Sequence, residues 1–159
     1  MEQYKLKNYE NRTSGLMNNG INETPIPTIH NMKLNQLVDI AKQDKDILAI
    51  LIFGSVARGE QHNNSDIDIC LMLMPQRQPY ENIFMSRKRL EYLSKFDMDI
   101  HIYQQMPLYI KKRILKEGKV IFMRNENLLY HLAIKTIKEF EDYKHIYYDY
   151  LEEVAKGGS

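Results

Sequence analysis

Two aspartates separated by one residue, Asp66 and Asp68, have the types and spacing of a metal site. Side chains two positions apart on a β-strand leave the same face, so the two carboxylates are predicted to lie side by side. Their repulsion raises at least one pKa unless a cation lies between them. Magnesium relieves such repulsion, since it binds through one or two carboxylates together with phosphate oxygens. The pair therefore predicts a divalent metal site.

A segment suited to phosphate precedes this pair. Gly54 and Ser55 follow an apolar run that predicts a buried strand, and a short helix is expected to begin there. A glycine lets a phosphate approach the backbone closely, and amides at a helix N-terminus favour an anion. The serine hydroxyl adds a donor. With the metal ligands opening the next strand, residues 54–68 predict a site for a nucleoside triphosphate.

A second pair of aspartates at the same spacing, Asp97 and Asp99, opens a later apolar segment. If that strand lies beside the strand of Asp68, one of its carboxylates can complete a two-metal site. Asp99 lies within the apolar alternation, on one face with Asp97 and His101. Asp97 lies at the strand entrance and is expected to be solvated, so Asp99 is the predicted third carboxylate.

The elements that must position these residues alternate between helices and short strands. The longest apolar run, 47–53, predicts a central strand buried on both faces. Further strands are expected over 67–74, 98–103 and 120–123. Helices are expected from about Asn31, over 79–95, over 107–116 and, as one long last helix, over 129–154. The predicted fold class is α/β or α+β, a small sheet with helices packed on it.

Length and composition suit one domain with a tail. The chain has 159 residues, of which 43% are hydrophobic and 27% charged, so it can bury a substantial core. Residues 1–31 are polar and show no lasting periodicity, which predicts an extended or disordered arm; a partner-binding role for this arm stays open. The domain is then expected over 32–155, with a frayed tail over 156–159.

Charge, hydropathy and cysteine content limit the expected location and partners. A net charge of +1 gives no general reason to expect nucleic-acid or membrane binding. The apolar runs are too short to span a bilayer, and the first ten residues lack the apolar core of a secretory signal. A single cysteine, Cys70, excludes an internal disulfide and a cysteine-based zinc site. We therefore expect a cytoplasmic protein without membrane or direct nucleic-acid contact.

Several residues near the predicted site also have a plain structural explanation. Arg58 can contact phosphate, or it can pair with Glu60 on the surface. His101 can touch the metal site, although a structural histidine is the simpler expectation. Cys70 shares the parity of Asp68 and can line the floor of the site, but a buried, inert thiol is the default.

Two surface features leave partner binding open. The basic residues of the helix over 107–116 form either a solvated face or a docking surface for an acidic partner or an RNA-bound toxin. They are Lys111, Lys112, Arg113 and Lys116. The tyrosines of the last helix are mainly packing residues by their spacing, and some are candidates for interface anchors.

The run Gly54-Ser55, ten residues, then Asp66-Ile67-Asp68 resembles the signature of the DNA polymerase β-like nucleotidyltransferase superfamily. Asp99 and residues 107–122 resemble the part that follows in these proteins, and residues 138–144 resemble part of their last helix. Within the superfamily the chain, over residues 33–154, is similar to minimal nucleotidyltransferase (MNT) proteins, the antitoxin partners of HEPN-domain toxins.

The resemblance implies a mixed sheet flanked by helices and an enzyme that transfers a nucleoside monophosphate from a nucleoside triphosphate, releasing pyrophosphate. By position, it assigns the triphosphate to Gly54, Ser55 and Arg58, and metal binding to Asp66, Asp68 and Asp99. Asp99 would share the catalytic ion with Asp68 and help to deprotonate the acceptor hydroxyl. Two Mg²⁺ ions and the substrate ATP are implied.

The antitoxin group further implies an acceptor, a tyrosine of the HEPN toxin, whose adenylylation would silence a ribonuclease. Two other hypotheses stay open. Transfer to a small molecule, as in aminoglycoside nucleotidyltransferases, would normally need extra helical mass to build an acceptor pocket. An antitoxin that acts by binding alone would not need the intact carboxylates and Ser55.

Overall fold

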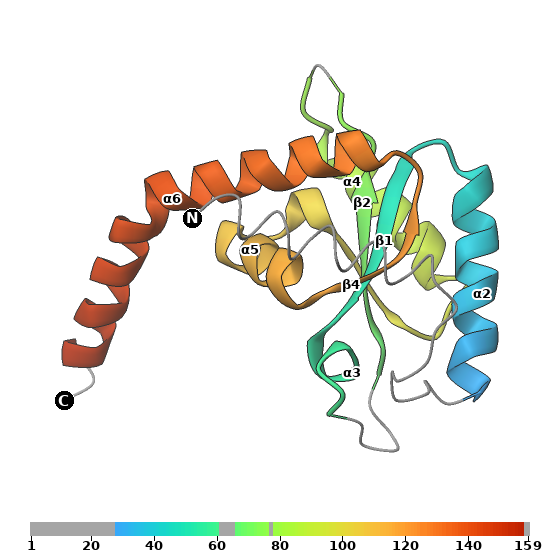
Figure 1. Cartoon of the computed structure of the whole chain (residues 1–159), viewed down its shortest axis with the longest axis horizontal. Helices are drawn as coiled ribbons and strands as arrows, with labels where there is room; N and C mark the ends of the chain where they lie inside the picture. Colours follow the sequence, from blue (N-terminus) through green and yellow to red (C-terminus); the bar gives the residue numbers. More distant parts are fainter. Residues whose placement is uncertain (1–27, 61–65, 77, 158–159) are drawn as a thin grey trace.

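A four-stranded mixed sheet forms the centre of the computed structural model, which describes residues 28–60, 66–76 and 78–157 (Figure 1). The strand order is β3-β2-β1-β4. The central strand β1 pairs antiparallel with β2 and β4, and β2 pairs parallel with β3. The strands are β1 (Ile47–Phe53), β2 (Asp68–Leu73), β3 (Asp99–Ile102) and β4 (Lys119–Met123).

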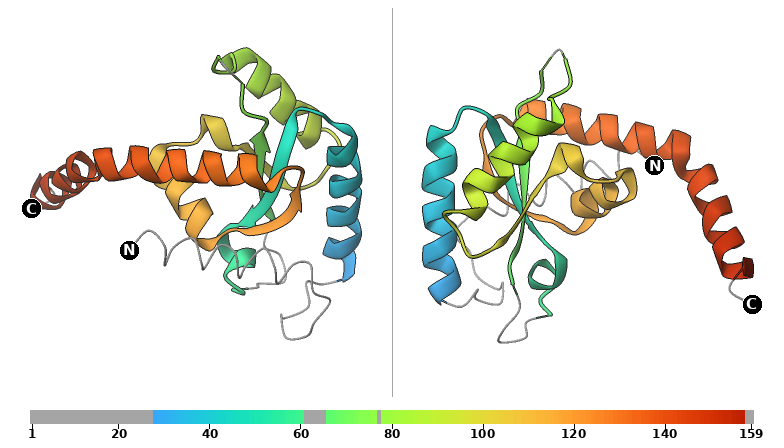
Figure 2. Two further views of the ribbon diagram at one scale, coloured as in Figure 1. Left: turned by 45° about the horizontal axis from the view of Figure 1, so that its top comes forward. Right: turned by 180° about the vertical axis from the view of Figure 1, so that it is seen from behind.

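Helices cover both faces of this sheet (Figure 2). One face packs against α2 (Thr28–Gln43) and α4 (Asn82–Leu93), and the other against α5 (Leu108–Glu117) and α6 (Glu126–Gly157). Two short elements complete the fold, the helix α3 (Gly54–Ala57) and the 3₁₀ turn η1 (Tyr103–Gln105). The predicted fold class, a small mixed sheet flanked by helices with a long C-terminal helix, is confirmed.

The alternation of side chains along β2 decides on which side of the sheet the site opens. Ile69 and Leu71 pack toward α2 and α4, whereas Cys70 packs toward α5 and α6. Asp68 shares the parity of Cys70 and therefore faces the α5 side. Cys70 is fully buried, and burial raises the pKa of its thiol, so it is the inert core thiol that the sequence favours.

The observed element boundaries differ from the predicted ones by a few residues. The third strand ends at Ile102 because Tyr103 opens η1, with its hydroxyl hydrogen-bonded to Thr136 of α6 at 2.6 Å. Pro107 precedes α5 as its cap, since its carbonyl accepts the N–H groups of Ile110 and Lys111.

The predicted domain limits fall partly outside the described residues. Residues 1–27 of the predicted arm are not among them, and α2 begins at Thr28. α6 continues to Gly157, into the predicted tail. Among the residues that the structure describes, no helix combines the length and the apolar character that crossing a lipid bilayer requires.

The start of β1 carries a cluster of paired charges, which we call the Lys88 cluster. The Lys88 ammonium of α4 lies 3.0 Å from both the Asp44 and the Asp46 carboxylates, and the Tyr92 hydroxyl donates to Asp44 at 3.0 Å. Burial alone would raise the pKa of Asp44, but hydrogen bonds from Lys88, the Asp46 amide and Tyr92 bring it below its ordinary value. The cluster ties α4 to the turn before β1.

The last helix divides into a buried and an exposed half. Leu129 and Ala133 pack in the core on the α5 side of the sheet, and Phe140 is also buried. The C-terminal part of α6 extends away from the sheet (Figure 1). There Tyr147 stacks on Tyr109 of α5, with ring centroids 5.5 Å apart, while Tyr150 is exposed. The tyrosines thus include both packing residues and exposed ones.

Candidate active site

Gly54 joins β1 to α3 in a conformation that only glycine adopts easily. Its φ is +75°, and a Cβ built there would collide with Oδ2 of Asp68. The bare backbone of Gly54 therefore lies directly against the Asp68 carboxyl group. The short helix that the sequence predicts after β1 is present, and its second residue is Ser55.

Three potential metal ligands converge next to this glycine. The parallel register of β2 and β3 sets Asp68 opposite Asp99. Nε2 of His101 lies 3.0 Å from Oδ2 of Asp99. One ligand atom from each of the three side chains lies within 4.8 Å of the other two. We call Asp68, Asp99 and His101 the Asp68 cluster.

The electrostatics of this cluster favour a cation. Burial raises the pKa of Asp68, and the neighbouring Asp99 raises it further through charge repulsion and a hydrogen bond. The charge of His101 opposes this rise, and that of Asp66 adds to it. Oxygen donors packed this closely suit a hard divalent ion, which would remove the repulsion. The residues present therefore fit the metal that the sequence predicts.

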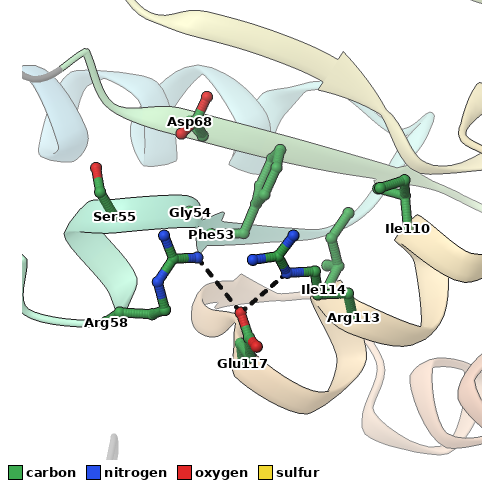
Figure 3. A pocket seen from close by; sticks show the side chains of 9 residues that line it. All are labelled: Phe53, Gly54, Ser55, Arg58, Asp68, Ile110, Arg113, Ile114 and Glu117. Carbon is green, nitrogen blue, oxygen red and sulfur yellow. Dashed lines mark hydrogen bonds and ion pairs between the residues drawn. The ribbon is translucent and has the colours of Figure 1, made fainter. Parts of the chain in front are cut away.

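A cleft of about 370 Å³ opens beside the Asp68 carboxylate (Figure 3). Two guanidinium groups reach one carboxylate in it: the side chains of Arg58 and Arg113 lie 3.5 and 3.4 Å from Oε2 of Glu117. Arg58 also pairs with Glu60 at 3.3 Å, the surface pairing that the sequence left open. The lining residues are Phe53, Gly54, Ser55, Arg58, Asp68, Ile110, Arg113, Ile114 and Glu117.

The structure brings together most of the predicted site residues. Gly54, Ser55, Arg58 and Asp68 line the cleft, and Asp99 lies beside Asp68. Asp97 has 97% of its side chain exposed and lies 3.7 Å from Lys33, which confirms that it is solvated.

Asp66 is placed differently from the expectation that it shares a strand face with Asp68. β2 begins only at Asp68, so Asp66 is an exposed residue ahead of the strand. The backbone there already contacts β3, because the Ile67 carbonyl accepts the Asp99 N–H at 3.0 Å. The charge of Asp66 acts on Asp68, and its role as a metal ligand stays a prediction.

The sequence did not identify the α5 wall of the cleft. Arg113 belongs to the basic group that the sequence predicts on α5, whereas no sequence pattern assigns its partner Glu117 or the apolar Ile110 and Ile114 to the site. The spacing of Arg113 and Glu117, one helical turn apart, is the sequence feature that indicates their ion pair. By contrast, Lys112 of the same basic group packs over the Phe140 ring at 3.9 Å.

Known proteins match both the sequence and the fold of this site. The sequence profile of the family described as "Polymerase beta, Nucleotidyltransferase" matches residues 35–127. A protein of Methanocaldococcus jannaschii, named for a proposed protein adenylyltransferase activity, is 42% identical over 78 residues. That match covers 48% of this chain and 56% of the relative, so the chain matches only about half of the relative's length.

Solved structures of toxin–antitoxin complexes share the fold. A toxin–antitoxin structure with AMP-PNP has a TM-score of 0.59 and 21% identity, covering 77% of this chain and 98% of the other. A complex of a tri-AMPylated Shewanella oneidensis HEPN toxin with an MNT antitoxin has a TM-score of 0.57 and 16% identity, covering 79% and 98%. With the profile match spanning β1 to β4 and both cluster aspartates, the chain belongs to the polymerase β-type nucleotidyltransferase family.

Proposed function

We propose that this protein transfers AMP from ATP, with Mg²⁺, to a tyrosine hydroxyl on a HEPN-domain ribonuclease toxin, and so acts as an antitoxin. The observation that carries the proposal is the meeting of Asp68 and Asp99 directly beside the bare backbone of Gly54. Two carboxylates next to a close-approach glycine can hold a metal and a phosphate at one point.

The carboxylates would hold the metal. Asp68 and Asp99 supply the convergent oxygens, and Asp66 supplies a third carboxylate from the segment before β2. Two bound Mg²⁺ ions would neutralise the phosphate charge and the charge that develops during transfer. The pKa of Asp68 is raised in the absence of a metal, and bound cations would lower it.

The triphosphate would lie along Gly54 and Ser55 with its charge facing the arginines. The Ser55 hydroxyl and the adjacent amides donate hydrogen bonds to phosphate oxygens. Arg58 and Arg113 already converge on a single carboxylate, Glu117, inside the cleft, so a polyanion can take over guanidinium donors from it.

The transfer step needs an acceptor oxygen in line with the leaving pyrophosphate. The acceptor oxygen forms a bond to the α-phosphorus as the bond between this atom and the pyrophosphate breaks. Asp99 would accept the proton of the acceptor hydroxyl, and the partial exposure of its side chain, 46%, supports this role. The opening of the cleft suits an acceptor carried by another protein.

Descriptions of related proteins support the donor and the acceptor. The structure with AMP-PNP contains an ATP analogue, and the HEPN toxin in the Shewanella oneidensis complex is AMPylated. The matched Methanocaldococcus jannaschii relative is also named for transfer to protein.

The test is transfer of labelled AMP from α-labelled ATP to the protein encoded beside this chain, followed by mapping of the modified residue. We expect Mg²⁺-dependent label on a tyrosine, and none with Asp68→Asn. Label found only on aminoglycosides would favour the small-molecule hypothesis. Absence of transfer, together with formation of a stable complex, would favour an antitoxin that acts by binding alone.

A further inference from the structure

His101 lies in the Asp68 cluster, although it is not part of the two Asp-x-Asp segments that predict the metal site. It follows Asp99 by two positions on β3, so both side chains leave the same face of the sheet. Its backbone lies opposite Cys70, whose side chain fills the core below. The imidazole is 29% exposed and is directed toward the Asp99 carboxylate.

The distance between His101 and Asp99 fits two ligands of one ion. Nε2 of His101 and Oδ2 of Asp99 are 3.0 Å apart. In octahedral coordination with bonds of about 2.1 Å, two adjacent ligand atoms lie roughly 3.0 Å apart. An ion can therefore bind both atoms, and an oxygen of Asp68 lies within 4.8 Å of each of them.

The imidazole ring is also held in place before any ion binds. The Phe53 ring at the end of β1 contacts it edge to face, with centroids 5.6 Å apart and an interplanar angle of 66°. Because this contact limits the rotation of the imidazole, less conformational entropy is lost when Nε2 binds an ion. Phe53 also lines the cleft, so the ring that contacts the imidazole is itself part of the cleft wall.

We propose that His101 is a nitrogen ligand of the divalent cation bound by Asp68 and Asp99, and that this site therefore binds Mn²⁺ more tightly than Mg²⁺. Imidazole is a favoured ligand of transition metals, whereas Mg²⁺ prefers oxygen ligands and keeps several waters. The inference rests on the proposed function only in that it uses the same metal site, and it adds a nitrogen ligand and a metal preference.

Pulsed EPR of Mn²⁺ bound to the full chain, without nucleotide, tests the proposal directly. We expect modulation from a directly bound ¹⁴N, which changes to the ¹⁵N pattern when the protein is grown with ¹⁵N-histidine. This isotope comparison needs no variant. Bound Mn²⁺ without nitrogen coupling would overturn the proposal, and His101 would then act as a hydrogen-bond partner of Asp99. Failure of the wild-type protein to bind Mn²⁺ would overturn it as well.

Variants give a second readout through metal affinity. His101→Gln should weaken Mn²⁺ binding about 10-fold or more, which is the typical loss of affinity when a group that supports a metal site is removed. The same change should weaken Mg²⁺ binding less. His145→Gln, at an exposed position on α6, is the matched control and should change neither affinity. Equal affinities for Mn²⁺ in His101→Gln and wild type would contradict the proposal.

An ATP analogue separates this proposal from the proposed function. Adding AMP-PNP to the Mn²⁺-loaded protein should introduce ³¹P coupling while the nitrogen coupling remains. Nitrogen coupling without ³¹P coupling or AMP transfer would overturn the proposed function and leave His101 as a ligand. Phosphorus coupling and transfer without nitrogen coupling would overturn the role of His101 alone.

Discussion

Two acidic clusters lie at opposite ends of β1, and they differ in how their charge is balanced. At the start of the strand, the Lys88 ammonium lies between Asp44 and Asp46, and the pKa of Asp44 is lowered. At the end of the strand, where Asp68 pairs with Phe53, Asp68 lies opposite Asp99, and the pKa of Asp68 is raised.

The comparison separates carboxylates that are paired with a cation of the chain from carboxylates whose repulsion is not fully balanced within the chain. A cation built into the chain is present from the moment of folding, so the Lys88 cluster contributes to stability. In the Asp68 cluster, the charge of His101 opposes the repulsion between the carboxylates only in part, so the pKa of Asp68 stays raised. A bound cation would supply the remaining balancing charge. Changes at the two ends of β1 should therefore affect different measurements.

The largest effect is expected at Asp68. Asp68→Asn should lower AMP transfer by roughly 10³-fold or more, the scale of losing a charge stabiliser in phosphoryl transfer. The same change should leave the metal-free free energy of unfolding equal or higher, because it removes the repulsion from Asp99. Transfer assays and chemical denaturation in EDTA measure the two effects. Full activity in this variant would remove the Asp68 cluster from the mechanism.

The next comparison is between the two aspartates that precede and open β3. Asp99→Asn should lower the transfer rate by several orders of magnitude while nucleotide binding is largely retained, since the proposed metal bridge and proton acceptor would be lost. Asp97→Asn is the matched control, because Asp97 is exposed and does not line the cleft. Single-turnover rates and nucleotide titration separate the two outcomes. If Asp97→Asn has the larger effect, the register of β3 against β2 is wrong.

At the other end of β1, Lys88→Met should mainly affect stability. Removing one partner of a largely buried ion pair costs about 3–5 kcal/mol, and the Lys88 side chain is only 11% exposed. Urea denaturation measures the loss, and transfer per folded molecule should be unchanged. Lys95→Met serves as the control, since Lys95 pairs with Glu91 on the surface and such pairs contribute about 0–1 kcal/mol.

A smaller loss is expected when only one hydrogen bond of the Lys88 cluster is removed. Tyr92→Phe deletes the hydroxyl that donates to Asp44 and keeps the buried ring. A hydrogen bond to a charged group contributes about 1.5–3 kcal/mol. Urea denaturation should therefore show a loss in the free energy of unfolding that is smaller than the loss for Lys88→Met. An unchanged free energy of unfolding would mean that Lys88 alone balances Asp44.

The smallest effect is the dependence of stability on pH, and its sign should differ between the clusters. Both aspartates have an ordinary pKa of 3.8. The pKa of folded Asp44 is lower, so its stabilising contribution is present above pH 3.8 and is lost as the pH falls through the folded value. The pKa of folded Asp68 is higher, so its contribution is present below pH 3.8 and is lost as the pH rises through the folded value.

Denaturation across this pH range in EDTA, with single variants, measures both signs. Relative to wild type, Asp44→Asn should lose more stability at pH 7 than at pH 3. Asp68→Asn should compare more favourably with wild type at pH 7 than at pH 3. Slopes of the same sign for the two variants would contradict the difference between the clusters.

The sequence predicts the elements well where burial decides them. The bounds of β1 match the prediction because its run is apolar on both faces and ends at a glycine. The ends of other elements depend on single tertiary contacts, which the hydrophobic periodicity of the sequence does not predict. Tyr103 was predicted as the last residue of the third strand but lies in η1, where its hydroxyl is hydrogen-bonded to Thr136, a residue far along the chain.

The site was predictable to the extent that it is local in sequence. Gly54, Ser55 and Asp68 lie close together in the chain, and the structure brings them into one cleft. The pairing of Asp68 with Asp99 depended on which strands are neighbours, which a single sequence leaves open. The convergence of Arg58 on Glu117 depends on the docking of α5 and could not be predicted from spacing.

The parallel pairing of β2 with β3 also has a consequence for folding kinetics. β1 and β2 are joined by residues 54–67, whereas β2 reaches β3 through the longer crossover that contains α4. Closing a longer connection costs more chain entropy, and non-local pairing slows folding. We therefore expect the β1–β2 hairpin to form before Asp68 meets Asp99. A divalent ion that needs both carboxylates would then bind only once β2 and β3 have paired, so it should act mainly by slowing the unfolding of the native protein.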